Sequence, residues 1–271
     1  MAERRHIAVS SEFEGKVVVV TGAAGGIGRA TVSRFLSAGA VVFASDIDGE
    51  ALIRMTQEMK PISRDVNAVV ADVTRVADCE RLVAAAAKGG GRLDVLVNCA
   101  GVWVEGPTEQ MSEEQWDRTI DVNLKGLFFC CSRAIPELKK TRGCIVNLSS
   151  DAGVVGTPET AIYTASKGGV SLLTRSLALE LAKDLVRVNA VCPADVMTPM
   201  LEGQARDFGG DDPEGYLKRL LETYPQGDKA RFITPDEVAE LIFYLAGEKA
   251  APITGALISI DFGSTAGYGY E

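Results

Sequence analysis

The sequence predicts an α/β fold in which one parallel sheet carries helices on both of its faces. Seven short apolar runs, rich in valine and isoleucine, alternate with stretches that have helical periodicity. Strands that are buried on both faces of a parallel sheet have this composition, and each crossover between them needs a helix. The chain has 271 residues, 46% of them hydrophobic, which is enough for a substantial core. We therefore expect a single domain over residues 1–271.

The expected elements follow one another in regular alternation. The strands are predicted from seven apolar runs, at residues 16–22, 40–46, 67–72, 93–98, 144–150, 186–193 and 256–261. The intervening helical stretches are Gly26–Ala38, Glu50–Met59, Thr74–Ala87, Ser112–Leu138, Thr160–Lys183 and Pro235–Ala246. The spacing from one run to the next suits βαβ units.

Two segments depart from this alternation. Residues 1–14 form a polar leader before the first strand. Residues 197–232 are rich in glycine, aspartate and charge, and we expect them to form an insertion with one or two short helices. Long insertions of this kind are usually lids or binding loops, so this segment is the expected substrate loop.

The charge of the chain argues against two classes of partner. The formal net charge is -9, and the 28 lysine and arginine residues are dispersed along the chain. A nucleic-acid-binding surface would need a concentrated basic patch. No apolar stretch has the length of a signal peptide's core or of a membrane span. We expect a cytoplasmic protein that binds neither nucleic acid nor membranes.

Cysteine and histidine usage excludes several catalytic classes. The six cysteines have neither metal-ligand spacing nor the density of a disulfide scaffold, and Cys79, Cys130 and Cys144 are expected to be reduced and buried. The only histidine is His6, in the leader. A histidine-dependent hydrolase or protease and a histidine-bound catalytic zinc are therefore improbable, and no metal site is expected.

A cluster of glycines follows the first predicted strand, in the segment "TGAAGGIGRA". Gly22, Gly26 and Gly28 would let the backbone turn tightly at the start of a helix, whose free N–H groups attract a pyrophosphate. No lysine follows the glycines, which disfavours a nucleoside-triphosphate loop. The pattern favours a dinucleotide, although tight packing without any ligand remains an alternative.

An aspartate closes the second predicted strand, eighteen residues after Gly28. Asp46 can accept hydrogen bonds from an adenosine ribose, and its charge would repel a 2′-phosphate. It could instead cap a helix, a role that Asp48 could equally serve. Asp72, at the end of the third strand, could likewise cap the helix that follows.

The segment "YTASK" places Tyr163 four residues before Lys167. On a helix these side chains lie on the same face, so the ammonium group would favour the phenolate form of the tyrosine. At roughly 4 Å and an effective dielectric of about 20, the attraction is about 4 kcal/mol before the cost of burial is subtracted. We expect this interaction to bring the pKa of the phenol towards neutrality. The pair could also lie on a solvated helix face.

Five motifs together resemble the short-chain dehydrogenase/reductase family, in order and spacing, from about Gly15 to Gly263. They are "TGAAGGIG", "NCAG" at 98–101, "NLSS" at 147–150, "YTASK" at 163–167 and "CPADVMT" at 192–198. The resemblance implies one Rossmann-type domain with a doubly wound, seven-stranded parallel sheet. It also implies a catalytic tetrad of asparagine, serine, tyrosine and lysine.

Each tetrad position has a matching residue in this chain. Tyr163 matches the general acid/base and Lys167 the residue that lowers its pKa and binds the cofactor ribose. Ser150 matches the serine that polarises the substrate oxygen, with Ser149 beside it as a minor alternative. Asn123 matches the asparagine that holds a water in a proton relay, although it could simply mark a kink within a helix.

The resemblance also implies a nicotinamide dinucleotide site and a small-molecule alcohol or ketone as the substrate. NADP-preferring relatives carry a basic residue in the glycine-rich turn or after the second strand, where this chain has Gly25 and Ile47, so the Asp46 carboxylate predicts NAD. The implied cofactor-binding residues are Gly22, Gly25, Gly26, Ile27, Gly28, Asp46, Ile47, Asp72, Val73, Asn98, Ala100, Gly101, Tyr163, Lys167, Pro193, Val196 and Thr198. Two positions depart from the family pattern: Cys99 replaces an asparagine, and Ala194 replaces a glycine near the nicotinamide. Alanine is restricted where glycine is free, so the second departure puts the local backbone path in doubt.

These features predict an NAD-dependent oxidoreductase that acts on a secondary alcohol or ketone. A catalytically silent dinucleotide sensor and a methyltransferase of similar topology are the alternatives, but neither needs the full tetrad. We expect a partly apolar substrate pocket with contributions from Trp103, Val154, Val155, Met197, Met200 and Leu201. The helices at Ser112–Leu138 and Thr160–Lys183 match those that pair between subunits in the family, which implies a homotetramer or, failing that, a dimer.

Overall fold

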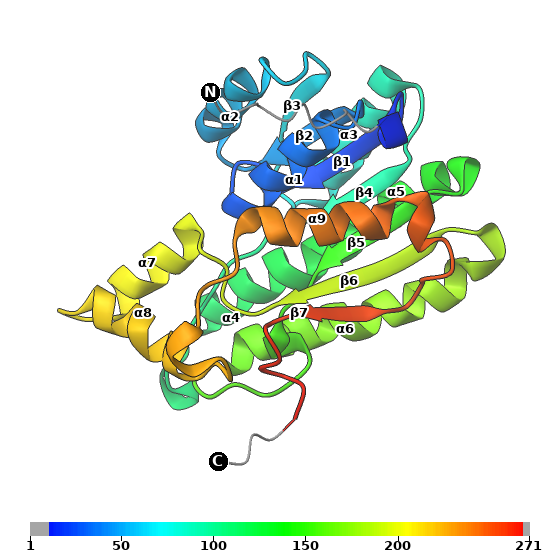
Figure 1. The fold of residues 1–271 in the computed structure, drawn as a ribbon. Coiled ribbons are helices and arrows are strands. Elements are labelled where there is room, and N and C mark those ends of the chain that lie inside the picture. The colour runs from blue at the N-terminus through cyan, green and yellow to red at the C-terminus, as the bar shows by residue number, and fades with distance from the viewer. Residues whose placement is uncertain (1–10, 268–271) are drawn as a thin grey trace.

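A seven-stranded parallel sheet forms the centre of the protein in a computed structural model that describes residues 11–267 (Figure 1). The strand order is β3-β2-β1-β4-β5-β6-β7, and every pairing is parallel. The strands are β1 (Val17–Thr21), β2 (Val41–Asp46), β3 (Val66–Val70), β4 (Val95–Asn98), β5 (Cys144–Leu148), β6 (Arg187–Pro193) and β7 (Leu257–Ile260). The predicted doubly wound α/β fold is confirmed, with a strand at each of the seven apolar runs.

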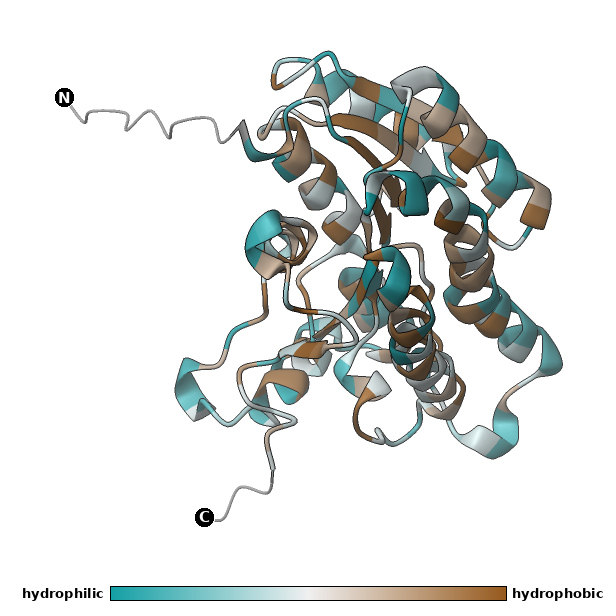
Figure 2. Ribbon diagram, turned by 90° about the vertical axis from the view of Figure 1, so that its right-hand side faces the viewer, coloured by the Kyte–Doolittle hydropathy of each residue, from teal (hydrophilic) through white to brown (hydrophobic). Residues whose placement is uncertain are grey.

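Three helices cover each face of this sheet. One face carries α1 (Gly26–Leu36), α2 (Gly49–Met59) and α9 (Pro235–Ala246), whose apolar side chains form one core cluster with the strands. The other face carries α3 (Val76–Gly90), α5 (Leu127–Thr141) and α6 (Ala161–Leu181), which form the second cluster. Figure 2 shows the hydrophobic strands enclosed between helices. Burial on both faces explains why the strands are apolar runs and not alternating ones.

The order of the strands reverses beside β1. This strand pairs with β2 on one side and with β4 on the other. The connections that leave the two halves therefore run in opposite directions, and they open a crevice at the carboxyl ends of the strands. In open α/β sheets such a crevice is the usual place for a ligand.

The helix predicted over Ser112–Leu138 is interrupted. It consists of α4 (Glu113–Ile120), a π-helical turn η3 (Asp121–Gly126) and α5, which continues to Thr141. Asn123 lies within the π turn, and both polar atoms of its side chain bond the backbone of Val102 on the loop after β4. The prediction of a uniform helix was wrong because these tertiary contacts, which periodicity does not reveal, hold the extra residue of the turn.

The segment predicted as an insertion projects from the edge of the sheet (Figure 1). It contains two short helices, α7 (Pro199–Phe208) and α8 (Pro213–Glu222). Thr198 caps α7, and its methyl group lies directly above Gly26 of α1. The insertion therefore begins in contact with the glycine-rich turn.

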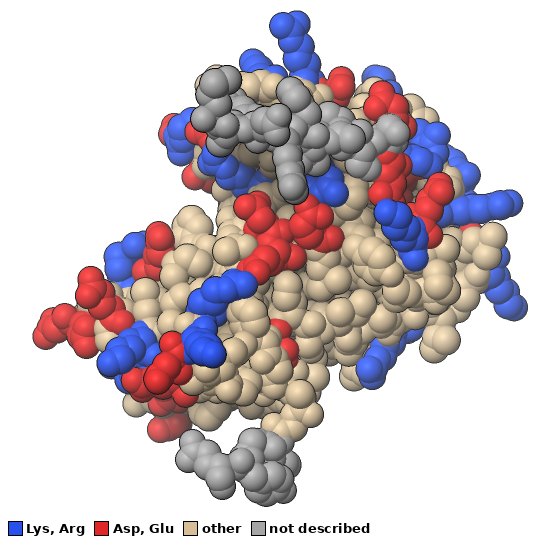
Figure 3. Space-filling view, in the orientation of Figure 1, with Lys and Arg blue, Asp and Glu red and all other residues tan. Residues whose placement is uncertain are grey.

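Several remaining predictions concern the ends and the surface of the chain. Residues 1–10 of the predicted leader, with His6, lie outside the described residues. No helix in the described part of the chain has the length and apolarity that a membrane crossing requires. On the face shown in Figure 3, acidic and basic side chains are interspersed, and no continuous basic patch is visible.

Candidate active site

A cavity of about 640 Å³ opens at the carboxyl ends of the strands. Loops after β1 to β6 all contribute to its wall, so residues far apart in sequence meet there. Of the predicted catalytic and cofactor-binding residues, only Asn98 and Asn123 do not line it. Those that do are Gly22, Gly25, Gly26, Ile27, Gly28, Asp46, Ile47, Asp72, Val73, Ala100, Gly101, Ser150, Tyr163, Lys167, Pro193, Val196 and Thr198.

The glycine-rich turn forms a cradle that side chains would fill. Gly22 has φ +64°, and a Cβ atom there would lie 2.7 Å from the backbone nitrogen of Ala100. A Cβ atom on Gly28 would overlap the carbonyl oxygen of Gly22. The helix α1 begins beside this turn without an acidic residue in its first turn. The bare backbone and the free helix N-terminus fit the pyrophosphate of a dinucleotide.

Asp46 lies at the edge of this cradle. Its Oδ2 accepts a hydrogen bond from the Ala24 nitrogen at 3.0 Å, and its Oδ1 accepts one from Asp48 at 3.1 Å. The capping of α2 falls to Asp48, whose side chain accepts from the Ala51 nitrogen. Asp46 is therefore not the helix cap, and its carboxylate lines the cavity.

Asp72 does not cap the helix that follows, because α3 begins after Arg75 without a side-chain cap. Its Oδ1 accepts hydrogen bonds from the backbone nitrogen and the hydroxyl of Thr74, at 2.9 and 2.7 Å. This contact stabilises the turn before α3. Asp72 also lines the cavity beside Val73, at the end away from Tyr163 where the wall is made by the loops after β2 and β3.

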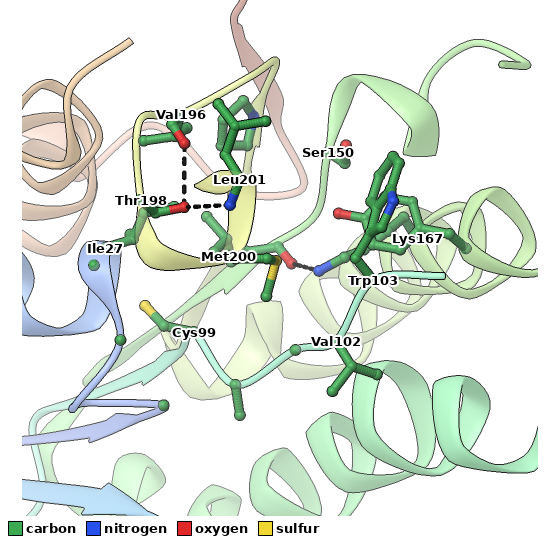
Figure 4. A pocket seen from close by; sticks show the side chains of 18 of the residues that line it. Ile27, Cys99, Val102, Trp103, Ser150, Lys167, Val196, Thr198, Met200 and Leu201 are labelled. Carbon is green, nitrogen blue, oxygen red and sulfur yellow. Dashed lines mark hydrogen bonds between the residues drawn. The ribbon is translucent and has the colours of Figure 1, made fainter. Parts of the chain in front are cut away.

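Tyr163 and Lys167 are both buried on the inner face of α6, with 9% and 4% of their surfaces exposed. The Lys167 Nζ lies 5.6 Å from the centre of the Tyr163 ring and donates a hydrogen bond to the Leu148 carbonyl at 2.8 Å. The alternative of a solvated helix face is thus excluded. Figure 4 shows Lys167 and Ser150 near Trp103 within the cavity.

The burial of this pair changes the pKa of both groups. Burial raises the pKa of the Tyr163 phenol well above its usual value of 10, and the nearby charge of Asp151 raises it further, while an interaction with the Ser150 hydroxyl lowers it. Burial also lowers the pKa of Lys167 to about 8. These shifts oppose the expectation that Lys167 brings the phenol towards neutrality, because desolvation is the largest cause and Lys167 is not among the groups that lower the pKa of Tyr163.

The two adjacent serines have different roles. The Ser149 hydroxyl is bonded to the Lys167 carbonyl and to the Ser171 hydroxyl, at 3.0 and 2.9 Å, which ties β5 to α6. The Ser150 hydroxyl donates to Asp151 Oδ1 at 2.7 Å and accepts from the Ala152 nitrogen at 3.2 Å. Ser149 is bonded to α6, whereas the Ser150 hydroxyl is bonded to the two residues that follow it, so Ser150 is the serine that can exchange its contact for one to a ligand.

The two asparagines that do not line the cavity form hydrogen bonds that hold the surrounding elements together. Asn98 donates to Asn147, which donates to Thr174 of α6, so a buried chain of side chains joins β4, β5 and α6. Asn123 bonds Val102 and also donates to Ser166, at 3.1 Å. Its amide fixes the loop after β4 against the helix that carries Tyr163.

Neither departure from the family pattern distorts the site. Cys99 lines the cavity, and burial raises the pKa of its thiol to about 12, so it is an inert apolar group. Ala194 is not among the residues with positive φ, and its nitrogen donates to the Ile260 carbonyl at 3.2 Å. The backbone path at this position is therefore one that alanine adopts without strain.

Comparison with known proteins accounts for this arrangement. The sequence model of the short chain dehydrogenase family matches residues 16–208. The chain belongs to this family. It is 41% identical over 252 residues to a 3-oxoacyl-(acyl-carrier-protein) reductase of Thermotoga maritima, covering 93% of this chain and 98% of the relative.

Two further relatives extend the comparison. The chain is 39% identical over 257 residues to meso-2,3-butanediol dehydrogenase of Serratia marcescens, covering 95% of this chain and 97% of the relative. The crystal structure of levodione reductase superposes with a TM-score of 0.89 at 29% identity, covering 94% of this chain and all of that one. The short-chain dehydrogenase family consists of oxidoreductases that bind nicotinamide dinucleotides, and the glycine cradle described above fits such a cofactor.

The part of the cavity around Tyr163 and Trp103 is more acidic than the sequence suggested. The carboxylates of Glu105, Asp151 and Asp195 line the cavity. Burial and the neighbouring charge of Asp151 raise the pKa of Asp195 to about 6. Asp151 directly follows "NLSS" and Asp195 follows "CPA", at the ends of β5 and β6. Both could have been found by the rule that located Asp46, because the carboxyl ends of parallel strands meet at one edge.

The predicted apolar lining is half correct. Trp103, Met200 and Leu201 line the cavity, and the Trp103 ring packs 4.3 Å from that of Tyr163. The exposed side chains that do not line it are Val154, Val155 and Met197. Arg118 of α4 was also missed, and it lines both this cavity and an adjoining one of about 420 Å³ between α4 and α7.

Proposed function

We propose that this protein is an NAD-dependent oxidoreductase that transfers a hydride between the dinucleotide and a secondary alcohol or ketone. The observation that carries the proposal is the meeting of Ser150, Tyr163 and Lys167 in the cavity that also contains the glycine cradle. A pure dinucleotide sensor has no need for three such groups beside one another. When bound, the dinucleotide supplies the hydride acceptor or donor and, in its oxidised form, a positive charge.

Tyr163 is the proposed general acid and base. Its raised pKa keeps the proton on the phenol at neutral pH, which suits donation to a ketone oxygen. In alcohol oxidation the same oxygen takes the hydroxyl proton, helped by the positive charge of Lys167. Ser150 donates a hydrogen bond to the substrate oxygen, and Asn123 positions the loop and helix around it.

The test is a spectrophotometric assay with a panel of secondary alcohols and ketones. We expect the absorbance of reduced nicotinamide to rise with alcohols and NAD, and to fall with ketones and NADH. A protein that binds NAD but changes absorbance with no member of the panel would be a silent sensor, and the proposed reaction would be wrong.

The preference for NAD over NADP is a first prediction. A 2′-phosphate would meet the Asp46 carboxylate, which already accepts two backbone hydrogen bonds. Arg29, the nearest candidate to bind that phosphate, forms an ion pair with Glu58 of α2. Leaving a charged group unpaired costs about 1–3 kcal/mol, so kcat/KM should favour NAD by roughly tenfold to a hundredfold.

Two variants check the source of this preference. Asp46→Ala should narrow the ratio of kcat/KM for NAD over NADP. Asp48→Asn is the matched control, because it removes a neighbouring carboxylate that does not line the cavity and keeps an acceptor for the cap of α2. Equal use of both cofactors by the native protein, or an unchanged ratio in Asp46→Ala, would contradict the assignment of Asp46.

Assembly into a homotetramer, or failing that a dimer, is a second prediction. The helices α4, α5 and α6 expose large apolar side chains: Trp116, Phe128, Leu172 and Leu179. Leu172 and Leu179 are 66% and 82% exposed. These helices match those that pair between subunits in the family, and exposed apolar surface there suits a protein interface. Light scattering at micromolar concentration should give the tetramer mass, and Leu179→Glu should lower it.

Ile62→Glu is the control for this measurement, because Ile62 is an exposed apolar residue in the loop after α2. Its substitution should leave the mass unchanged. A monomer mass for the native protein would refute the predicted assembly.

A further inference from the structure

We infer that Asp151 makes the cavity selective for carbinols with a second hydroxyl on the neighbouring carbon, that is, for vicinal diols and α-hydroxy ketones. This inference rests on the proposed function and names the substrate class of the same site. A serine hydroxyl has one proton to donate, and in Ser150 a hydrogen bond to Asp151 already uses it.

The Ser150 proton is held by Asp151. The Ser150 Oγ donates to Asp151 Oδ1 at 2.7 Å, and the Ala152 nitrogen donates to both side chains. A reacting oxygen that binds Ser150 must take this proton away from Asp151. Asp151 is partly buried, and a carboxylate that loses a donor there is destabilised. Binding of a simple alcohol therefore forms one hydrogen bond and breaks another.

A neighbouring hydroxyl on the substrate removes this cost. Two oxygens on adjacent carbons lie about one hydrogen-bond length apart, which matches the spacing of the Ser150 and Asp151 oxygens. The reacting oxygen can then accept from Ser150 while the second hydroxyl donates to Asp151. In oxidation the reacting carbon and its hydroxyl lose one hydride and one proton. The second hydroxyl keeps its proton, and the product is an α-hydroxy ketone.

The rest of the substrate end suits a ligand rich in hydroxyl groups. Glu105 Oε2 accepts from the Trp103 indole and the Tyr216 hydroxyl, at 3.1 and 2.8 Å, and Asp195 Oδ2 accepts from the Tyr224 hydroxyl at 3.1 Å. Within the described residues, the second oxygen of each carboxylate makes no hydrogen bond, so it can accept one from a ligand. Glu105, Asp151 and Asp195 outnumber the two cations that also line the cavity, Arg118 and Lys167, which disfavours a substrate that is itself a carboxylate.

The experiment compares substrates that differ at one position. The substrates are cyclohexanol, 2-methylcyclohexanol, cis- and trans-1,2-cyclohexanediol, 2-aminocyclohexanol and 2-hydroxycyclohexanecarboxylate, each with NAD. We expect the better diol isomer to exceed cyclohexanol and the methyl compound in kcat/KM by about tenfold to a hundredfold, the range for one hydrogen bond to a charged group. The carboxylate should be the poorest substrate.

Asp151→Ala tests the residue itself. The ratio of kcat/KM for the diol over cyclohexanol should fall to near one, because the diol loses its acceptor and Ser150 is released for any alcohol. If Asp151 only stabilised the local structure, its loss would lower kcat/KM for the diol and for cyclohexanol by the same factor, and their ratio would not change. Glu109→Ala, which removes an exposed carboxylate outside the cavity, is the control and should keep the native ratio.

Binding to Tyr163→Phe with NAD, measured by calorimetry, gives a readout that does not need turnover. The diol should bind at least tenfold more tightly than cyclohexanol. Equal affinity and equal kcat/KM for the two would overturn the inference while leaving the oxidoreductase proposal intact. An amino alcohol that exceeds the diol tenfold would show that the carboxylates select a cation instead. Activity with no alcohol would defeat the proposed function itself.

Discussion

Tyr163→Phe is expected to lower kcat/KM by about 10²–10⁴-fold, the usual contribution of a general acid or base. The substitution removes only the hydroxyl group, and the ring keeps its contact with Trp103. No histidine in the described part of the chain can take over the proton transfer. The affinity for NAD should change by less than about threefold, because the glycine cradle and Asp46 are untouched.

The measurement combines steady-state kinetics with calorimetric titration of NAD. Tyr216→Phe is a matched control, since Tyr216 also lines the cavity but its hydroxyl donates to Glu105 rather than facing Ser150. We expect kcat/KM of this control to fall by less than about tenfold, the cost of one hydrogen bond. Tyr163→Phe with more than a tenth of native activity would show that another group moves the proton.

Lys167→Met is expected to lower activity by a similar factor and, unusually for a buried substitution, to stabilise the fold at neutral pH. The pKa of Lys167 falls from 10.5 to about 8 on folding, because burial disfavours the ammonium form. This shift corresponds to about 3 kcal/mol against folding when the group is charged. Methionine has a similar shape without the charge. It cannot form the hydrogen bond to the Leu148 carbonyl, and this loss reduces the expected gain in stability by about 1 kcal/mol or more.

The pH dependence has a definite sign. Below pH 8 the lysine is charged in both states, and the native protein carries the full cost. Between pH 8 and 10.5 the unfolded state binds more protons than the folded state, so native stability rises relative to the variant. Denaturant unfolding of both proteins from pH 6 to 10 should therefore show a difference that is largest below pH 8 and shrinks above it. A constant difference would mean that Lys167 is not desolvated.

Local chemistry explains why so much of the fold was predictable. Apolar runs identified the seven strands because both faces of the sheet are covered, and the glycine cradle was visible because its backbone leaves no room for side chains. The spacing of Tyr163 and Lys167 placed both on one face of α6. The predicted helix over Ser112–Leu138 was wrong only at its π turn, which depends on the contact between Asn123 and Val102.

By itself, the sequence determined which side chains share a strand end or a helix face, since those relations depend only on the periodicity of local structure. It thereby located the cradle, Asp46 and the Tyr163–Lys167 pair, while the resemblance to the family added Ser150. Only the tertiary structure decided their environment. Burial raises the pKa of Tyr163, and packing brings Asp151 and Asp195 into the same cavity. Desolvation and charge coupling depend on everything that surrounds a group, and those neighbours come from distant parts of the chain.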